Sequence, residues 1–144
     1  MPVTNTRPHR RLTAALRSAL PSALAAEMEL EPGDIAMTRP DIFWRFRGAG
    51  RGGVAVMVDG CQWHGCALHA RPHATAKAQA AVHGLSPEGI FRQQQTDRRG
   101  REAMRANGIM VLAIWEHDIN ADLGACVRRV ADALGAPLAT RRTG

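Results

Sequence analysis

Two cysteines and a histidine follow a short β-branched run, and their spacing restricts how the middle of this 144-residue chain can fold. Cys61, Cys66 and His69 form the pattern C-x4-C-x2-H directly after the run at residues 54–58. Thiolates and a neutral imidazole are ligands that suit a tetrahedral structural Zn²⁺. Residues 61–84 show no clean hydrophobic period, and an irregular segment of this length needs something to order it. The sequence therefore predicts a loop ordered by zinc.

A closed structural zinc site needs a fourth ligand, and His117 is the best candidate. His117 ends the strand predicted at residues 109–116, and a neighbouring strand would bring it beside the loop. Cys126 is a weaker candidate because its helical spacing places it on a core face. The alternative without metal is a buried thiol pair with solvent-exposed histidines.

The order of the predicted elements indicates a mixed α/β fold. The elements are a helix at 12–26 that breaks at Pro21, strands at 41–46 and 54–58, a helix at 87–106 capped by Ser86, a strand at 109–115, and a last helix capped by Asn120. The run at 109–115 is almost continuously apolar, which is typical of a strand buried on both faces. We expect a small central mixed sheet flanked by helices.

The charge balance favours a polyanionic partner. The formal net charge is +6 and the sequence pI is about 10.8, and the excess is almost entirely arginine because Lys77 is the single lysine. Basic side chains neutralise phosphates and release counterions, so nucleic acid is the expected partner, although a genomic bias in composition also favours arginine. No stretch approaches the roughly 18 apolar residues of a membrane span, and no secretory signal is visible. We expect a cytoplasmic protein with a basic flexible arm at 1–11, one domain at 12–136 and a basic tail at 137–144.

Asp41, Val58 and His64 form a second candidate site. Asp41 begins one predicted strand, and the carbonyl group of Val58 ends its hairpin partner, so both offer oxygen ligands to one Mg²⁺. Histidine titrates near neutral pH, which suits His64 to act as general base on a water molecule. Asp41 alone is as well explained as a turn carboxylate, but Asp59 and His64 nearby favour a catalytic role.

Several motifs, in order, resemble those of the very short patch repair (Vsr) endonucleases, which are similar in fold to the PD-(D/E)XK nuclease superfamily. They are residues 39–43 (Arg-Pro-Asp-Ile-Phe), 58–61 (Val-Asp-Gly-Cys), 63–66 (Trp-His-Gly-Cys), 96–99 (Thr-Asp-Arg-Arg) and 114–117 (Ile-Trp-Glu-His). The resemblance covers about residues 39–117. It implies a DNA endonuclease with catalytic Mg²⁺ and structural Zn²⁺.

The resemblance also implies roles for single residues. The Mg²⁺ ligands would be Asp41 and the carbonyl group of Val58, the general base would be His64, and the zinc ligands would be Cys61, Cys66, His69 and His117. Asp97 would reach toward the site from its helix, and Asp59 lies next to it with a less defined role. Trp63, preceded by Gln62, would press against DNA bases. Arg98 and Arg99 are candidates for contact with DNA because they would lie next to the nuclease site.

The chain departs from the Vsr pattern at Gln62, Gln93 and Thr13, where the family usually has an aromatic residue, an asparagine and a glutamate. Stacking on a base contributes roughly 1–3 kcal/mol, so the change at Gln62 bears on mismatch recognition. Glu27 or Glu29 could replace the glutamate missing at Thr13. Mismatch repair, restriction and a DNase toxin all remain compatible settings.

Other interpretations stay open. Arg98, Arg99, Arg101 and Arg105 belong either to a solvated helix face or to a phosphate-contacting surface, and Trp115 is expected in the core. The protein is either a strand-nicking endonuclease, a catalytically inactive zinc-stabilised DNA-binding module, or a small zinc hydrolase in which His64 replaces His117 at the metal. A monomer or weak dimer is expected, because one active site cuts one strand.

Overall fold

A computed structural model describes residues 6–46, 52–60 and 87–138. Its elements are α1 (Arg7–Ala19), α2 (Ser22–Ala26), β1 (Glu29–Leu30), β2 (Ile42–Arg45), β3 (Gly53–Asp59), α4 (Pro87–Ala106), β4 (Ile109–Trp115), α5 (Glu116–Ala121) and α6 (Leu123–Leu134). The strands form one sheet in the order β1-β2-β3-β4, antiparallel except for the parallel pair β3–β4. The prediction of an α/β fold with a small mixed sheet flanked by helices is confirmed.

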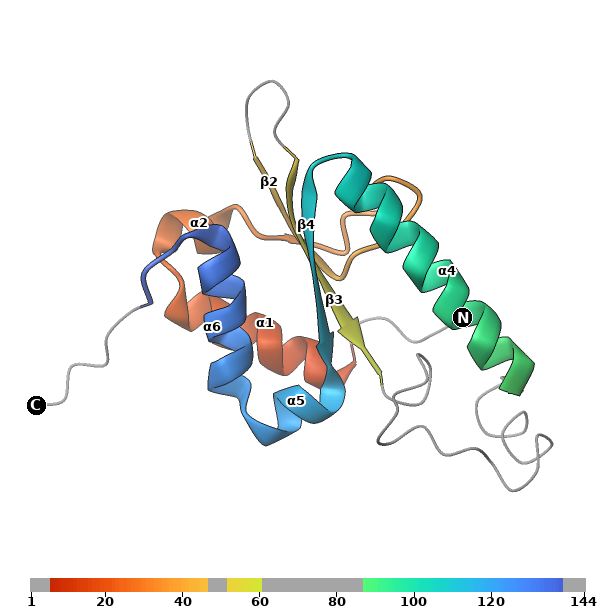
Figure 1. The fold of residues 1–144 in the computed structure, drawn as a ribbon. Helices are drawn as coiled ribbons and strands as arrows, with labels where there is room; N and C mark the ends of the chain where they lie inside the picture. Colours follow the sequence, from red (N-terminus) through yellow and green to blue (C-terminus); the bar gives the residue numbers. More distant parts are fainter. Residues whose placement is uncertain (1–5, 47–51, 61–86, 139–144) are drawn as a thin grey trace, which may run out of the picture.

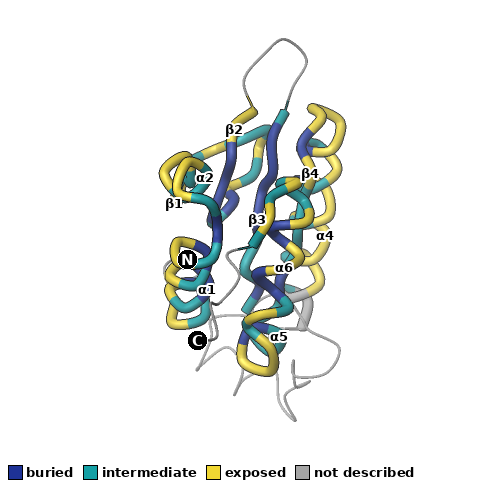
Figure 2. Tube along the Cα trace, turned by 90° about the vertical axis from the view of Figure 1, so that its left-hand side faces the viewer, coloured by how far each residue is buried: buried dark blue, intermediate teal, exposed yellow. Residues whose placement is uncertain are grey.

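Helices cover both faces of this sheet (Figure 1). The helices α1 and α6 lie on one face, and α4 lies on the other. Side chains of a strand point alternately to the two faces, so Val54 and Val56 of β3 join the core under α1 and α6, while Ala55 joins a smaller core with Met104 of α4. Figure 2 shows β3 as a buried strand between these layers.

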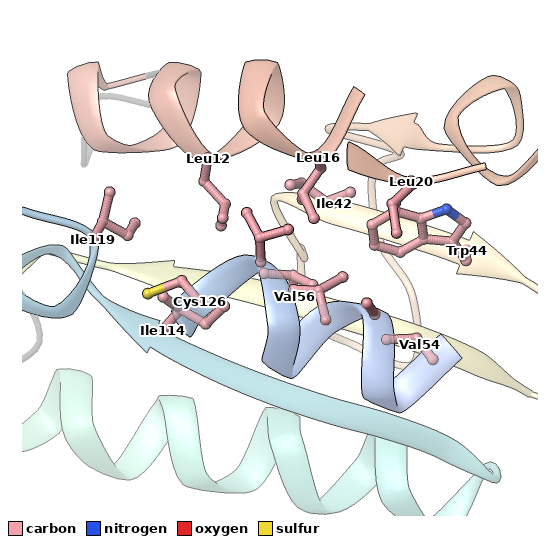
Figure 3. Packing of buried hydrophobic residues seen from close by; sticks show 13 residues of the cluster. Leu12, Leu16, Leu20, Ile42, Trp44, Val54, Val56, Ile114, Ile119 and Cys126 are labelled. Carbon is pink, nitrogen blue, oxygen red and sulfur yellow. The ribbon is translucent and has the colours of Figure 1, made fainter. Parts of the chain in front are cut away.

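The first helix packs on the sheet through a leucine stripe. Leu12, Leu16 and Leu20 recur every four residues, so they share one helical face, and all are at most 5% exposed. Figure 3 shows them pointing toward the strands. The helix begins at Arg7 and not at Leu12, so the prediction of a flexible arm extending to residue 11 is wrong. The buried face simply continues one turn further, to His9, which is 4% exposed.

β4 is an edge strand of the described sheet. It pairs with β3 along its whole length, and Met110 on it is 51% exposed. The prediction that residues 109–115 are buried on both faces is correct only in part: Ile114 and Ile109 are buried in the cores on the two faces, but the rest of the strand is half-buried or exposed. The bounds of the strand are as predicted. The more completely buried strand is β3, which has a neighbour on each side.

The chain after β4 forms two short helices. Asn120, predicted to cap the last helix, lies inside α5, and its Oδ1 accepts a hydrogen bond from Arg11 Nη1 at 2.8 Å. The cap of α6 is Asp122, whose carboxylate accepts a hydrogen bond from the backbone N–H of Ala125 at 3.0 Å. Cys126 lies in the core, as its spacing predicts, and burial raises the pKa of its thiol. In the described ranges no helix has the length and apolar character that crossing a membrane requires.

Gly100 lets α4 approach the turn before β2. A Cβ at this position would collide with the side chain of Thr38, whose backbone forms a bridge with Ile35. Replacing a helical glycine with alanine normally stabilises a helix by about 1 kcal/mol, whereas overpacking costs about 1–3 kcal/mol. We expect Gly100→Ala to lower the free energy of unfolding, measured by urea denaturation.

Gly124 provides the matched control for that prediction. It also lies in a helix, but a Cβ there would meet Arg128 and Asp122 only at 3.5 Å, which is ordinary contact. Gly124→Ala is expected to stabilise the protein slightly. Equal effects of the two substitutions would contradict the close approach of α4 to Thr38.

Candidate functional site

Asp41 is held by main-chain groups at the end of β3. Its N–H donates to the carbonyl oxygen of Val56 at 3.0 Å, and its own carbonyl oxygen accepts from the N–H of Glu31 at 3.0 Å. Its carboxylate Oδ2 accepts from the N–H of Val58 at 2.7 Å. The structure therefore brings together Asp41 and Val58, which the sequence proposed as neighbours in a metal site.

His9 is a residue near Asp41 that the sequence analysis did not identify. Its Nε2 lies 3.5 Å from the carbonyl oxygen of Asp41, although 32 residues separate the two in sequence. Thr13, where the family usually has a glutamate, lies one turn further along α1 and is also buried. Glu29, considered as a replacement for that glutamate, has Oε1 3.4 Å from Arg45 Nη2. The spacing of His9 from the leucine stripe was the available signal, because it places a histidine on the buried face of α1.

Asp59 ends β3 with a buried ion pair. Its carboxylate Oδ2 lies 2.6 Å from Arg101 Nη2 of α4, and the two side chains are 2% and 17% exposed. Alternation along the strand points Asp59 to the face that α4 covers. The Nε of Arg101 is buried without a hydrogen-bond partner in the part of the chain that the structure describes. The pair thus fixes α4 against the same end of β3 that Asp41 contacts.

A pocket of about 450 Å³ opens between this strand end and α4. Its lining consists of Asp59 and Trp115 from the sheet, with Gln94, Asp97, Arg98, Arg101 and Arg105 from α4. Asp59 and Trp115 are register partners in the parallel pair β3–β4, so the strand register places them side by side. Three guanidinium groups against two carboxylates leave the lining with an excess of positive charge.

The pocket lining contains some of the residues that the sequence predicted to be functional and leaves out others. It brings together Asp59, Asp97 and Arg98, and Asp97 Oδ1 also accepts a hydrogen bond from Gln93 Nε2 at 2.9 Å. Arg99 is exposed on α4 and is outside this lining. Trp115, expected in the core, is instead a lining residue. The sequence left open whether the arginines of this helix form a phosphate-contacting surface, and it did not predict the pocket that they line.

His117 lies at the start of α5 and not at the end of a strand. Its ring stacks on Trp115, with centroids 6.1 Å apart and an angle of 8° between the planes. Its Nε2 lies 3.3 Å from Asp118 Oδ1. The other predicted zinc ligands and the predicted loop contacts lie outside the described residues: Cys61, Cys66, His69, Gln62, Trp63 and His64. Within the described ranges, no cluster of three or more histidine, cysteine or acidic side chains could hold a metal.

The arrangement combines two chemical capacities. A carboxylate has about four lone-pair sites, so Asp41 can accept from Val58 and still offer oxygen to a hard cation such as Mg²⁺. The neighbouring pocket presents guanidinium groups, which suit phosphate oxygens. A divalent cation and a phosphate ester could therefore be bound side by side.

Comparison with known proteins identifies a nicking enzyme as a relative. No protein-family model matches the chain. Over 124 residues, or 84% of this chain, it is 34% identical to the type II nicking enzyme V.NaeI of Lentzea aerocolonigenes. The matched segment covers 66% of that relative, so the chain spans slightly less than two thirds of its length. The likeness extends over most of the chain and is not confined to one motif.

Proposed function

We propose that this protein is a Mg²⁺-dependent DNA endonuclease of the Vsr type, with a PD-(D/E)XK-like fold, that nicks one strand. The observation that carries the proposal is the Asp41 carboxylate, held 2.7 Å from the N–H of Val58 beside an arginine-lined pocket. Similarity to a nicking enzyme supports both the reaction and its single-strand outcome.

Asp41 and the carbonyl group of Val58 fit a magnesium ion because both provide oxygen, the ligand atom that this cation prefers. When bound, Mg²⁺ supplies positive charge that stabilises the phosphate undergoing displacement. Asp41 serves to hold and orient that charge, and its main-chain bonds keep the carboxylate in place before substrate arrives. His9 helps to hold the backbone of Asp41 from the other side.

The roles of the general base, of Asp97 and of the zinc ligands are those that the resemblance to the Vsr family implies. His64 is proposed to take the proton from the attacking water, a transfer that typically contributes about 10²–10⁴-fold to a rate. Asp97 orients this water or His64 from α4. Cys61, Cys66, His69 and His117 are proposed to bind a structural Zn²⁺ that orders the segment carrying His64.

The proposed partner is duplex DNA, mismatched or modified, in the cytoplasm. Trp63 and Gln62 are proposed to contact bases near the cut, and Arg98 to contact the backbone. The protein is proposed to be a monomer or weak dimer. A monomer has a single Asp41 site and nicks one strand, whereas cleavage of both strands would require a dimer or two sequential events. The departures at Gln62 and Thr13 leave three settings for this activity: mismatch repair, restriction of foreign DNA and a DNase toxin.

The metal requirement tests this function directly. Purified protein, dialysed without chelator so that zinc is retained, is incubated with supercoiled plasmid with and without Mg²⁺. We expect open circles to accumulate only with Mg²⁺, while the zinc content, measured by elemental mass spectrometry, stays unchanged.

Two other outcomes would replace the proposal. Protein that binds plasmid, mismatched and methylated duplexes but nicks none of them with Mg²⁺ is a non-catalytic DNA-binding module. Protein that nicks without Mg²⁺ and loses activity only when zinc is removed is a zinc hydrolase.

A further inference from the structure

We propose that the pocket under α4 is a binding site for the backbone phosphates of one DNA strand, formed by Arg98 and Arg105 around a floor that Asp59 and Arg101 fix. This inference takes DNA as the ligand from the proposed function and goes further, because it assigns the strand contact to one face of one helix. It also replaces the sequence-based pair Arg98 and Arg99 with a pair that lies seven residues apart.

The spacing along α4 produces one continuous stripe. Gln94, Arg98, Arg101 and Arg105 follow one another at intervals of four, three and four residues, so they share a face of the helix. The pocket lining contains all of them. Arg99 and Arg92 lie about 100° and 120° around the helix from Arg98, on a different face.

The length of the stripe matches the repeat of a nucleic-acid strand. Arg98 and Arg105 are separated by about 10 Å of helix. One DNA strand carries a phosphate for each 3.4 Å or so of duplex axis, and the spacing along the winding strand itself is larger, so this distance spans fewer than three phosphate intervals. A strand that runs along α4 can therefore meet both guanidinium groups at once.

The arginines of the pocket differ in burial, and we infer different roles for the buried and the exposed ones. Arg101 is mostly buried, and its Nη2 is engaged by the Asp59 carboxylate at 2.6 Å. Arg98 and Arg105 are exposed and reach the pocket from its rim. Asp59 offsets the charge of Arg101, and Asp97 is the remaining carboxylate of the lining. The attraction for phosphate therefore comes from the rim pair, whose two charges exceed the one of Asp97, and Arg101 holds α4 against the strand end.

The stripe also lies close to the proposed catalytic carboxylate. Asp59 at the pocket floor is adjacent in sequence to Val58, whose N–H holds Asp41. A phosphate bound at the inner end of the pocket would therefore lie near the metal ligands. The pocket would set which phosphodiester of the strand reaches Asp41.

Binding without cleavage tests the inference. Fluorescence anisotropy of a labelled duplex is measured without Mg²⁺ over a series of salt concentrations, for wild type, Arg98→Gln, Arg105→Gln and the double variant. We expect each single change to weaken binding about tenfold at low salt. The slope of log affinity against log salt should become shallower by about 0.9 for each lost contact.

Arg92→Gln is the matched control, because it removes the same charge from an exposed position of the same helix outside the pocket. We expect it to change the slope by much less than either pocket variant. Inorganic phosphate at matched ionic strength should not displace the duplex, since the site binds a run of phosphates and not a single ion.

Each contrary outcome points to a different failure. If Arg92→Gln or Arg99→Gln has the effect of Arg98→Gln, the helix contributes only diffuse charge and the pocket is not the site. If the wild type nicks plasmid but the pocket variants keep its salt slope, this inference fails and the proposed function stands. A wild type that binds no DNA overturns both.

Discussion

Replacing Asp41 with alanine should lower the rate of plasmid nicking by about 1,000-fold, which corresponds to about 4 kcal/mol in the barrier. The carboxylate supplies the side-chain oxygen of the proposed metal site, and its loss leaves only the carbonyl group of Val58. Stability should change far less, because Asp41 is partly exposed and a hydrogen bond such as the one from the N–H of Val58 is worth about 1 kcal/mol. Initial rates on supercoiled plasmid and urea denaturation measure the two quantities.

Two further variants test whether the effect depends on the charge of Asp41 and is specific to this position. Asp41→Asn keeps an oxygen that can accept from the N–H of Val58 but removes the charge, so it should be almost as inactive and nearly as stable as wild type. Asp34→Ala removes an exposed carboxylate that pairs with Arg39 at 2.8 Å, and it should nick normally. An active Asp41→Asn protein would show that the negative charge of Asp41 is not needed for nicking.

Replacing Arg101 with methionine should cost about 3–5 kcal/mol of unfolding free energy. The reason is that Asp59, with its side chain 2% exposed, would keep its charge in a buried position without the guanidinium that offsets it. A second change, Asp59→Val in the same protein, should recover most of the loss, because an apolar pair of similar volume is often as stable as a buried ion pair. Thermal and urea denaturation of the single and double variants test both statements.

The exposed pair of Arg45 and Glu29 is the control for the buried one. These side chains are 58% and 39% exposed and 3.4 Å apart, so Arg45→Met should cost only about 0–1 kcal/mol. If Arg101→Met fails to fold, the unfolding free energy of Arg101→Lys is measured instead, because lysine keeps the positive charge but not the geometry of the guanidinium group. A cost for Arg101→Met no larger than that for Arg45→Met would contradict the interpretation of Asp59 as a buried charge.

Sequence patterns predicted the parts of the fold that depend on local periodicity. The leucine stripe of α1, the break at Pro21, the bounds of β4 and the end of α4 before Gly108 all follow from spacing and backbone preference. The adjacency of Asp41 and Val58 was also predictable, because a hairpin brings a strand start opposite the end of its partner. These features need no information about distant parts of the chain.

Features that depend on long-range packing were not predictable in the same way. β1 has only Glu29 and Leu30, too few residues for a period, and the edge position of β4 depends on which strand pairs with β3. The ion pair of Asp59 and Arg101 joins residues 42 apart in sequence. The apolar pattern of β4 predicted a strand correctly, but its burial depended on neighbours that a local pattern does not contain.

The hydrogen bonds around Asp41 determine which substitutions can be made near it without moving its carboxylate. Main-chain groups of Glu31, Val56 and Val58 hold this residue, and every amino acid except proline offers the same N–H and carbonyl groups. The side chains of Glu31 and Val58 can therefore be exchanged without removing these hydrogen bonds, provided that the strands still pair, whereas the side chain of Val56 is constrained by the core. Under the proposed function, the position of the metal-binding carboxylate is thereby separated from the surface that would select the DNA, so specificity could diverge while the chemistry stays in place.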